Sequence, residues 1–483
     1  MGGNDIAGAT TNKHTPTAAG SYTVTVSASG CNPKTSAAVV VNSTPGTLSG
    51  NITISPSPGS VINIVMTATY SGSETITEWQ WKKDGVDIGT NSSTFTPTAT
   101  GNYTVTASSA SHNPKTSAAV TVYGVGSGTA GDPFNVCNVA TLQKVGTGTD
   151  GWGMDKHYKQ VANIDLASVA NWTPIGTYSP SNPFTGSYDG NGHTISNLKI
   201  PSATDLGVGL FGAIGSGAVV KSVGVNCNIT VTVNVVGGVV GMNYGGTVEN
   251  CYSTGTVSGD SGVGGVVGNN PVPGSTVQNC YSECNVTSTN ASFPSNAGGV
   301  VGVNGDQYDS GTVRNCYSTG NVSAGSNAGG VVGDNGVAGR TVQNCYATGN
   351  VSGTGSSVSV GGVQGYSNGA SVVNCVALCP NINGSGSNVR RVAGLTSSTG
   401  TADVTNCYGR SDMKRNNTGG GWSSNAGSGD GADITSDDWK LASWWEGKGF
   451  TTVNWDFTGI NATHLPKLKN MPEGTAAQNP VIQ

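Results

Sequence analysis

Charged side chains are scarce in this chain. Asp, Glu, Lys and Arg make up only 10% of the 483 residues, against about a quarter in ordinary globular proteins. The net charge is −5 and the pI is near 5.5, which argues against nucleic acid or an anionic membrane as a partner. No run approaches the roughly 18 apolar residues that a membrane-spanning helix needs. We therefore expect no membrane insertion within this segment.

Motifs of enzymes and metal sites are also missing. The sequence has no His-Glu-x-x-His, no Gly-x-Ser-x-Gly and no phosphate-binding loop, the patterns of zinc peptidases, serine hydrolases and nucleotide-binding enzymes. Only five His are present and no Cys-x-x-Cys occurs, which argues against a zinc site. The sequence predicts no catalytic residue, no metal and no cofactor.

Glycine is abundant instead, at 76 of 483 residues, and a short pattern returns nine times. The steps between its Asn or Ser positions run from 25 to 36 residues, a period that indicates a solenoid, a propeller or an array. Such units bury a core only by stacking. The nine copies are centred on Val161-Ala-Asn163-Ile164, Ile195-Ser-Asn197-Leu198, Val220-Lys-Ser222-Val223, Val248-Glu-Asn250-Cys251, Val277-Gln-Asn279-Cys280, Val313-Arg-Asn315-Cys316, Val342-Gln-Asn344-Cys345, Val372-Val-Asn374-Cys375 and Val404-Thr-Asn406-Cys407.

The pattern predicts which side chains face inward. The column that holds Cys in later copies begins with Ile164, Leu198 and Val223, so we expect it to be internal and Ile164 to lie in line with Cys407. The next column starts with Asp165 and Lys199 and should reach solvent. Strict alternation through Val, a variable residue, Asn and Cys would place the Cys column on the outside with the variable residue, so the Asn must be a bend that resets the alternation. Asn tolerates the left-handed conformation of such a bend, and stacked Asn side chains can pair between coils.

A second element shares the period and completes each repeat. It is Gly-Leu-Phe-Gly at 209–212, Gly-Val-Val-Gly at 238–241, 265–268, 299–302 and 330–333, and Gly-Val-Gln-Gly at 362–365. Together with segments such as 255–259, it leaves three short β segments per repeat and no helical stretch. The fold class is therefore all-β, and we predict a three-sided, right-handed parallel β-helix of about nine coils, capped at both ends.

These elements, followed by Asn-Cys-Tyr-Ser-Thr-Gly, resemble the GLUG repeats of bacterial surface and adhesin-like proteins, which also precede the catalytic region of some IgA-cleaving metallopeptidases. The lead-in at 158–166, 172–176 and 184–195 is similar too, so the resemblance covers roughly residues 132–475. Most copies carry Val where the motif has Leu, and a seventh decays to Val392-Ala-Gly-Leu395. The resemblance implies extracellular or cell-surface display and attachment, and it supplies no catalytic residues.

Tryptophans mark the ends of the repeats. Trp152 and Trp172 precede them, the next Trp is Trp422, and four more follow it. We read these clusters as caps, because a stacked helix must cover its terminal coils. The segment from Ser436 to Trp445 has helix-start signals and is predicted to be a short helix lying over the last coil.

The N-terminal quarter contains two copies of another unit. Residues 15–39 return 81 residues later at 96–120, and the second copy has Trp81 and a Gly-x-Tyr103 motif typical of an immunoglobulin-like sandwich. The first copy lacks the front strands, so we expect a longer parent protein. The predicted organisation is an incomplete immunoglobulin-like domain at 1–45, a second at 46–124, a linker with the N-terminal cap and first coil at 125–185, repeats at 186–410, and a C-terminal cap and tail at 411–483.

The eleven cysteines have two interpretations. Six occupy one interior column, where buried thiols acting as small apolar groups are favoured over disulfides, because parallel side chains fit the disulfide torsion poorly. Cys284 and Cys379 lie four residues after Cys280 and Cys375. A local disulfide therefore stays an alternative for these two.

An aromatic column is the main candidate binding site. Its predicted members are Tyr252, Tyr281, Tyr317, Tyr346 and Tyr408, which on the outside would form a stripe suited to sugar rings or a partner's apolar surface. The alternative is that the rings stack on one another and stiffen the rod.

Two function classes remain compatible with the sequence. The first is a non-catalytic adhesin-like protein, or the non-catalytic segment of a larger surface peptidase, that binds an extracellular glycan or a host or cell-surface protein. The second is a β-helical polysaccharide lyase or hydrolase, whose candidate residues are Asp306, Asp309 and Arg314 on one coil and Asp334 and Arg340 on the next. The scarcity of carboxylates favours the first.

Overall fold

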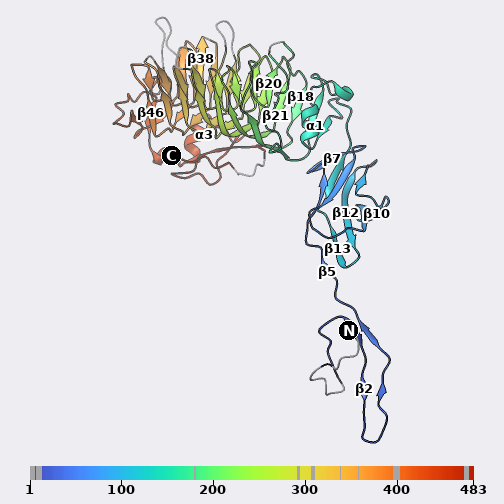
Figure 1. Cartoon of the computed structure of the whole chain (residues 1–483). Helices are drawn as coiled ribbons and strands as arrows, with labels where there is room; N and C mark the ends of the chain where they lie inside the picture. Colours follow the sequence, from blue (N-terminus) through green and yellow to red (C-terminus); the bar gives the residue numbers. More distant parts are fainter. Residues whose placement is uncertain are drawn as a thin grey trace. The chain divides into compact units, whose positions relative to one another are not determined.

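The structure is a computed structural model of the chain, and it describes residues 6, 13–178, 181–290, 294–305, 311–337, 339–356, 358–394, 403–472 and 478–482. The chain divides into two compact units (Figure 1). One contains residues 1–56 and 63–122, and the other contains residues 57–62 and 123–483. Both are built almost entirely of β-strands, as the sequence predicts.

The second N-terminal copy forms two antiparallel sheets around a small core. Trp81 and Tyr103 are buried between them. The Tyr103 hydroxyl donates to the Ala99 carbonyl at 2.8 Å, as expected for the tyrosine corner of an immunoglobulin-like sandwich. One sheet contains β9 (Glu78–Lys83), β10 (Val86–Ile88), β12 (Gly101–Ser109), β13 (His112–Thr116) and β14 (Val120–Tyr123), and the other contains β6 (Ile52–Ser55), β8 (Met66–Tyr70) and β11 (Thr94–Phe95).

The first copy keeps the same local pairing without a comparable core. Its described strands are β1 (Gly20–Tyr22), β2 (Thr25–Val26), β3 (Lys34–Thr35) and β4 (Val39–Val41). Thr25 faces Thr35 in the register that Thr106 and Thr116 adopt in the second copy. Val39 and Val40 are about two-thirds exposed. The 81-residue repeat is therefore a structural repeat as well.

The larger unit is a β-solenoid in which successive coils pair as parallel strands. Its first sheet has ten strands that run the length of the stack (Figure 1). These are β15 (Phe134–Val136), β16 (His157–Gln160), β18 (Ser187–Asp189), β21 (Val219–Lys221), β25 (Thr247–Glu249), β29 (Thr276–Gln278), β34 (Thr312–Arg314), β39 (Thr341–Gln343), β44 (Ser371–Val373) and β48 (Asp403–Thr405).

The second sheet is long in the early coils and divides in two after β26. Its early strands are β17 (Ile164–Asp165), β19 (Thr194–Ile200), β22 (Gly224–Thr230) and β26 (Tyr252–Gly259). One branch then continues through β30 (Tyr281–Ser282), β35 (Tyr317–Ser318), β40 (Tyr346–Ala347), β45 (Val376–Ala377), β49 (Tyr408–Arg410) and β51 (Ala432–Ile434). The other continues through β31 (Asn285–Ser288), β36 (Val322–Ala324), β41 (Val351–Gly353), β46 (Asn381–Asn383) and β50 (Lys414–Arg415).

The Gly-Val-Val-Gly element and the residues beside it form two short sheets rather than one. The coils of β23, β27, β32, β37 and β42 bend at a pair of glycines, such as Gly264 and Gly265, so that two brief strands replace one segment. The first of these sheets contains β23 (Val236–Gly237), β27 (Val263–Gly264), β32 (Asn296–Gly298), β37 (Asn327–Gly329), β42 (Ser359–Gly361) and β47 (Val389–Arg390). The second contains β20 (Phe211–Ile214), β24 (Val240–Asn243), β28 (Val267–Asn269), β33 (Val301–Val303), β38 (Val332–Val337) and β43 (Gln364–Asn368).

The predicted bend is present in the seven copies from Ser222 onward, and Asn197 of the second copy is also left-handed, with a φ of 57°. Ser222 and the six Asn from Asn250 to Asn406 have φ between 51° and 54°, in the left-handed region that Asn tolerates better than most residues. The Asn side chains also pair between coils, as from Asn374 Nδ2 to Asn344 Oδ1 at 3.1 Å. The inward column that includes Val223 and Cys407 is fully buried.

The predicted register of the first two copies is wrong. Tyr158 and Tyr188, and not Val161 and Ile195, lie in line with Val220. Both rings are buried in the core, so aromatic residues fill the inward position that Val holds in later coils. Ile164 pairs with Ile195, which pairs with Val225. It therefore belongs to the small-residue column of Ser253 and not to the column of Cys407.

That small-residue column packs against the first glycine of each Gly-Val-Val-Gly element. A Cβ added to Gly330 would lie 2.6 Å from the Ala347 Cβ, far inside van der Waals contact. In the last coil, a large residue takes the position of the glycine, and a glycine takes the position of the small residue. Arg390 pairs with Gly361, which places Arg391 where earlier coils have glycine, and Gly409 replaces the small residue. A Cβ on Gly409 would lie 2.5 Å from the Arg391 side chain.

Both ends of the solenoid are covered. At the start, α1 (Val139–Lys144) follows β15, and Trp152 stacks on Phe134 with ring centroids 4.6 Å apart. At the other end, Trp422 packs against the solenoid core. The helix predicted from Ser436 reaches the last coil through Trp444, whose ring lies 5.3 Å from that of Tyr408, but it also extends along the side of earlier coils. It forms α2 (Ser436–Trp439) and α3 (Ala442–Gly447), and their Trp side chains pack against the tyrosines of the second sheet.

Candidate functional site

The predicted tyrosine column exists and is regularly stacked. The rings of Tyr252, Tyr281, Tyr317 and Tyr346 have successive centroid distances of 4.8, 4.9 and 5.0 Å. Their planes are within 10° of parallel. This spacing matches the separation of hydrogen-bonded strands, about 4.8 Å. The column is therefore the self-stacked ladder that the sequence offered as an alternative to a binding stripe.

The prediction that this column faces solvent is wrong. All four rings are at most 5% exposed, because the C-terminal segment of residues 436–472 and 478–482 covers them. Trp445 and Trp455 lie with ring centroids 5.6 Å from that of Tyr346. The Tyr346 hydroxyl donates to the Pro466 carbonyl at 2.6 Å. The hydroxyls thus hold this chain's own segment.

Tyr408, the fifth predicted residue, is also engaged by the C-terminal segment. Its ring is half-buried, lies edge-on to Trp444 at 5.3 Å and faces the Lys448 ammonium at 4.6 Å. Burial raises the pKa of Tyr252 to about 12, so its hydroxyl stays neutral at ordinary pH. A role of these five tyrosines in binding stays a prediction, but a ligand would first have to displace the C-terminal segment.

The cysteines are all free thiols, including Cys284 and Cys379. Ten of the eleven are buried, in agreement with the interpretation of the interior column as small apolar groups. Burial raises the pKa of Cys379 to about 12, which keeps the thiol protonated and unreactive. The local disulfide alternative is not present.

The candidate acidic cluster is described only in part. Asp306 and Asp309 lie outside the described residues. Asp334 accepts hydrogen bonds from the Gly336 amide at 2.8 Å and from Asn296 at 3.3 Å, and Arg340 is buried. Within the described ranges, no group of three or more His, Cys, Asp or Glu could hold a metal ion.

A groove on the second sheet is the best candidate for a ligand site. It has a volume of about 520 Å³ and crosses the branch formed by β31, β36, β41 and β46. The inward Val or Ile of each strand is buried in the core and fixes the side chains on either side of it outward. The groove is lined by Asn285, Val286, Thr287, Asn321, Val322, Ser323, Asn350, Ser352, Asn381, Asn383 and Asn417.

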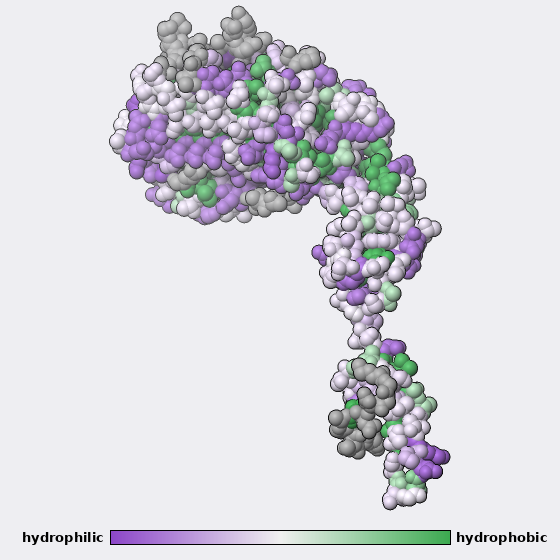
Figure 2. Space-filling view, viewed as in Figure 1, coloured by the Kyte–Doolittle hydropathy of each residue, from purple (hydrophilic) through white to green (hydrophobic). Residues whose placement is uncertain are grey.

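Two columns of polar side chains form the walls of this groove. The first contains Asn285, Asn321, Asn350 and Asn381, and the second contains Thr287, Ser323, Ser352 and Asn383. Neither column includes a charged residue. Hydrophilic residues gather over this region, near β46, in the space-filling view (Figures 1 and 2). The lining is therefore an uncharged array of carboxamides and hydroxyls.

The amides of the groove are held in place, while several hydroxyls remain available. Asn321 Nδ2 donates to Asn285 Oδ1 at 3.3 Å, and Asn350 Nδ2 donates to Asn321 Oδ1 at 3.2 Å. Within the described part of the chain, the Thr287 and Ser323 side chains make no hydrogen bond. Oriented amides beside free hydroxyls can donate to and accept from a polyhydroxylated ligand.

This groove was not predicted from the sequence, although a signal was present. The repeated Asn-Val-Thr or Asn-Val-Ser at 285–287, 321–323 and 350–352 places two polar residues around one inward Val. That alternation is typical of a strand with one solvated face. The concavity comes from the stacking of coils and is not visible in any single repeat.

Two segments of the described solenoid, 232–258 and 294–323, match the GLUG motif. The chain therefore carries the GLUG motif in two segments of its solenoid. The matched segments include the glycine bends, the Asn corner at Asn250 and the beginning of the groove at Asn321 and Ser323. The family resemblance proposed from the sequence is thereby confirmed.

Two curated proteins are similar to parts of this chain. Halomucin of Haloquadratum walsbyi is 32% identical over 195 residues, which are 36% of this chain and 2% of that protein. A "Putative Gly-rich membrane protein" of Evansella cellulosilytica is 31% identical over 133 residues, 26% of this chain and 15% of that protein. The chain thus spans only a small part of the length of either relative.

One solved structure also matches this chain. It is described as a "putative immunoglobulin A1 protease from Bacteroides ovatus" and is 23% identical, with a TM-score of 0.48. The match covers 71% of this chain and 94% of that one.

In the described part of the chain, no helix is long and apolar enough to cross a membrane.

Proposed function

We propose that this chain is a non-catalytic, extracellular or cell-surface protein whose GLUG-repeat solenoid binds a glycan along the asparagine-lined groove. The observation that carries the proposal is the uncharged lining of amides and hydroxyls over four coils. Four strands about 4.8 Å apart extend over roughly 14 Å, enough for an extended ligand to contact several coils. Such a ligand gains affinity from repeated weak contacts.

Three further observations support this proposal. The GLUG motif and the glycine-rich relatives accord with display outside the cell. The groove offers donors and acceptors without a charged group, which suits sugar hydroxyls better than a charged polymer. The aromatic column, the other candidate surface, is already covered by the C-terminal segment. A protein partner would instead be expected to require a larger contact area, about 800 Å² on each partner.

A substitution inside the groove tests the proposal. Screening on a glycan array, followed by titration calorimetry of the best ligand, is expected to show binding by the wild type. Ser323→Lys places a long charged side chain in the centre of the groove and should weaken binding at least about tenfold, through the loss of several contacts of about 1 kcal/mol each. The strand is expected to remain folded because Ser323 points outward.

Thr230→Lys is the matched control. Thr230 lies in the same outward column, three coils earlier and outside the groove, so this variant should bind as the wild type does. Both variants should melt at the wild-type temperature. Absence of glycan binding, or binding that Ser323→Lys leaves unchanged, would refute the proposal. Capture of a protein in place of a glycan would refute the glycan assignment.

A further inference from the structure

The first wall of the groove continues beyond the groove into a cationic residue. Parallel pairing of β46 with β50 places Lys414 directly after Asn381 in the column that begins with Asn285. Lys414 is exposed, and Asn417, three residues later, lines the groove. A row of neutral amides therefore ends, one coil further, at a positive charge.

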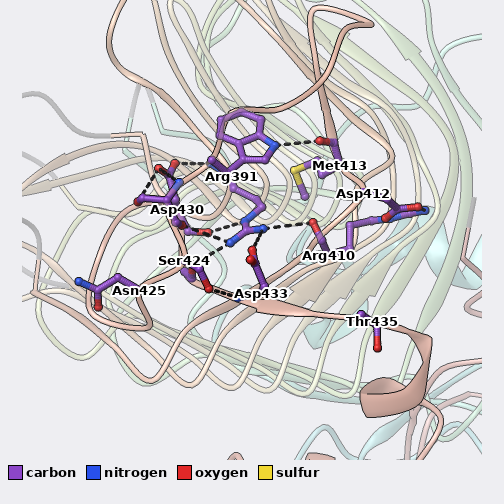
Figure 3. A network of polar contacts seen from close by, with 12 residues as sticks. Arg391, Arg410, Asp412, Met413, Ser424, Asn425, Asp430, Asp433 and Thr435 are labelled. Carbon is purple, nitrogen blue, oxygen red and sulfur yellow. Dashed lines mark hydrogen bonds and ion pairs between the residues drawn. The ribbon is translucent and has the colours of Figure 1, made fainter.

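Three acidic residues at this end of the solenoid, Asp412, Asp430 and Asp433, already have basic partners. Asp412 accepts two hydrogen bonds from Arg410, at 2.7 and 2.8 Å. Asp433 accepts one from Arg391 at 2.6 Å (Figure 3). Arg410 is also the main reason why the pKa of Asp412 is lowered, with a smaller contribution from Lys414. None of these carboxylates binds the Lys414 ammonium.

Asp430 is engaged in the same way. Its carboxylate accepts from the Ser423 hydroxyl at 2.9 Å and lies 3.6 Å from the Arg390 guanidinium. Arg415, next to Lys414, donates to the Gly386 carbonyl at 2.7 Å and lies over the Trp422 ring. Across the described ranges, the Lys414 side chain has no hydrogen bond or ion pair. It is thus available to an external anion.

We propose that Lys414 recognises an anionic group, a carboxylate or a sulfate ester, on the glycan that occupies the groove. The inference rests on the proposed function and narrows its ligand to acidic polysaccharides. It also gives the bound chain a direction, because the amide-lined coils accept neutral sugar hydroxyls and the acidic unit lies at the β50 end. An ammonium on a flexible stem suits either anion, since it acts as a point charge.

The test compares matched oligosaccharides on the full chain. One is a uronic-acid oligosaccharide, the second is the same molecule after reduction of its carboxyl groups to alcohols, and the third is its sulfated derivative. The wild type should bind an acidic form about threefold more tightly than the neutral form, the size expected of one exposed ion pair. This preference should shrink at 0.5 M salt. The better of the two acidic forms identifies the anion.

Two variants complete the experiment. Lys414→Gln should bind the neutral form as the wild type does and should lose the preference for the acidic forms. Lys221→Gln removes a half-buried cation of the first sheet, which is paired with Asp189 at 3.5 Å, and should keep that preference. Equal binding of acidic and neutral forms by the wild type, or loss of preference in both variants, overturns the inference but leaves the proposed function intact. Failure of all three to bind overturns both.

Discussion

A single backbone angle at the corner asparagines determines how each coil turns. At these positions φ is near +52°, and both the Val two residues before the Asn and the Cys directly after it face the core. A residue with a Cβ other than Asn or Asp meets a steric cost of about 1–2 kcal/mol there. The side-chain amide makes a second contribution to stability, because it forms hydrogen bonds with the amides of the coils before and after. Asn is thus selected for its conformation and for its side chain together.

Two substitutions at Asn344 separate the contribution of the backbone conformation from that of the side-chain hydrogen bonds. Asn344→Gly keeps the conformation and loses the amide bonds to Asn315 and Asn374, at a cost of about 1 kcal/mol per bond. Asn344→Ala loses the same bonds and adds the steric cost of a left-handed residue, so it should unfold at a lower urea concentration than the glycine variant. Equal unfolding midpoints for the two variants would show that the backbone angle contributes nothing.

At the scale of one coil, stability depends on pairs of residues with matched sizes. In regular coils a glycine faces Ser or Ala, and in the last coil Arg391 faces Gly409. The Arg391 guanidinium donates to the carbonyls of Asp430 and Gly431, at 2.7 Å each (Figure 3). These bonds hold the irregular loop of residues 423–431 over the final coil. The replacement of glycine by Arg391 therefore ends the repeat, and the Arg391 side chain holds the loop that covers the last coil.

Arg391→Met tests this arrangement. The change should destabilise the protein by about 3 kcal/mol, because it leaves buried carbonyl groups without donors. Arg390→Met is the control. The Arg390 side chain is 41% exposed and makes a 3.6 Å ion pair, so its loss should cost less than about 1 kcal/mol. The free energy of urea unfolding is the measurement, and similar losses in the two variants would contradict the assignment.

Regular coils were predictable from the sequence, and irregular ones were not. From Ser222 onward, the inward Val, the Asn bend and the Cys column were all predictable, because the same residue types return in each coil. The first two coils were misaligned, since Tyr158 and Tyr188 fill the inward position with a different residue type. The two short sheets at the glycine bends were predicted as one segment. A Gly-Gly pair does not by itself show whether the chain continues straight or turns.

At the scale of the whole solenoid, a segment outside the repeat decides which outer column is accessible. The rings of Tyr317 and Tyr346 would be exposed on an isolated stack, but residues 436–472 bury them in a second apolar cluster. Burial of a large aromatic side chain contributes roughly 1.5–3 kcal/mol. Several such side chains make displacement of the segment by a sugar ligand unfavourable. The groove, which lacks this cover, is the accessible surface.

Trp445→Ala measures how firmly this segment is attached. Trp445 is fully buried, and its removal should cost about 3–5 kcal/mol. We expect the segment to become susceptible to protease before the solenoid unfolds, with an increase in the binding of a hydrophobic dye. Trp444→Ala, at a half-buried site, should have a smaller effect. Simultaneous loss of both parts in a single transition would show that they form one cooperative unit.

The sequence by itself determined the parallel stack, the inward columns from the third copy onward and the left-handed corners. Stacking turns a one-dimensional period into vertical columns, so that residues repeated along the chain become neighbours in space. Only the tertiary structure decided that the tyrosines are covered, that Arg391 ends the core and that two polar columns enclose a groove. The first two features depend on non-repeated segments, which leave no periodic trace in the sequence, and the groove forms only when the outward residues of successive coils stack.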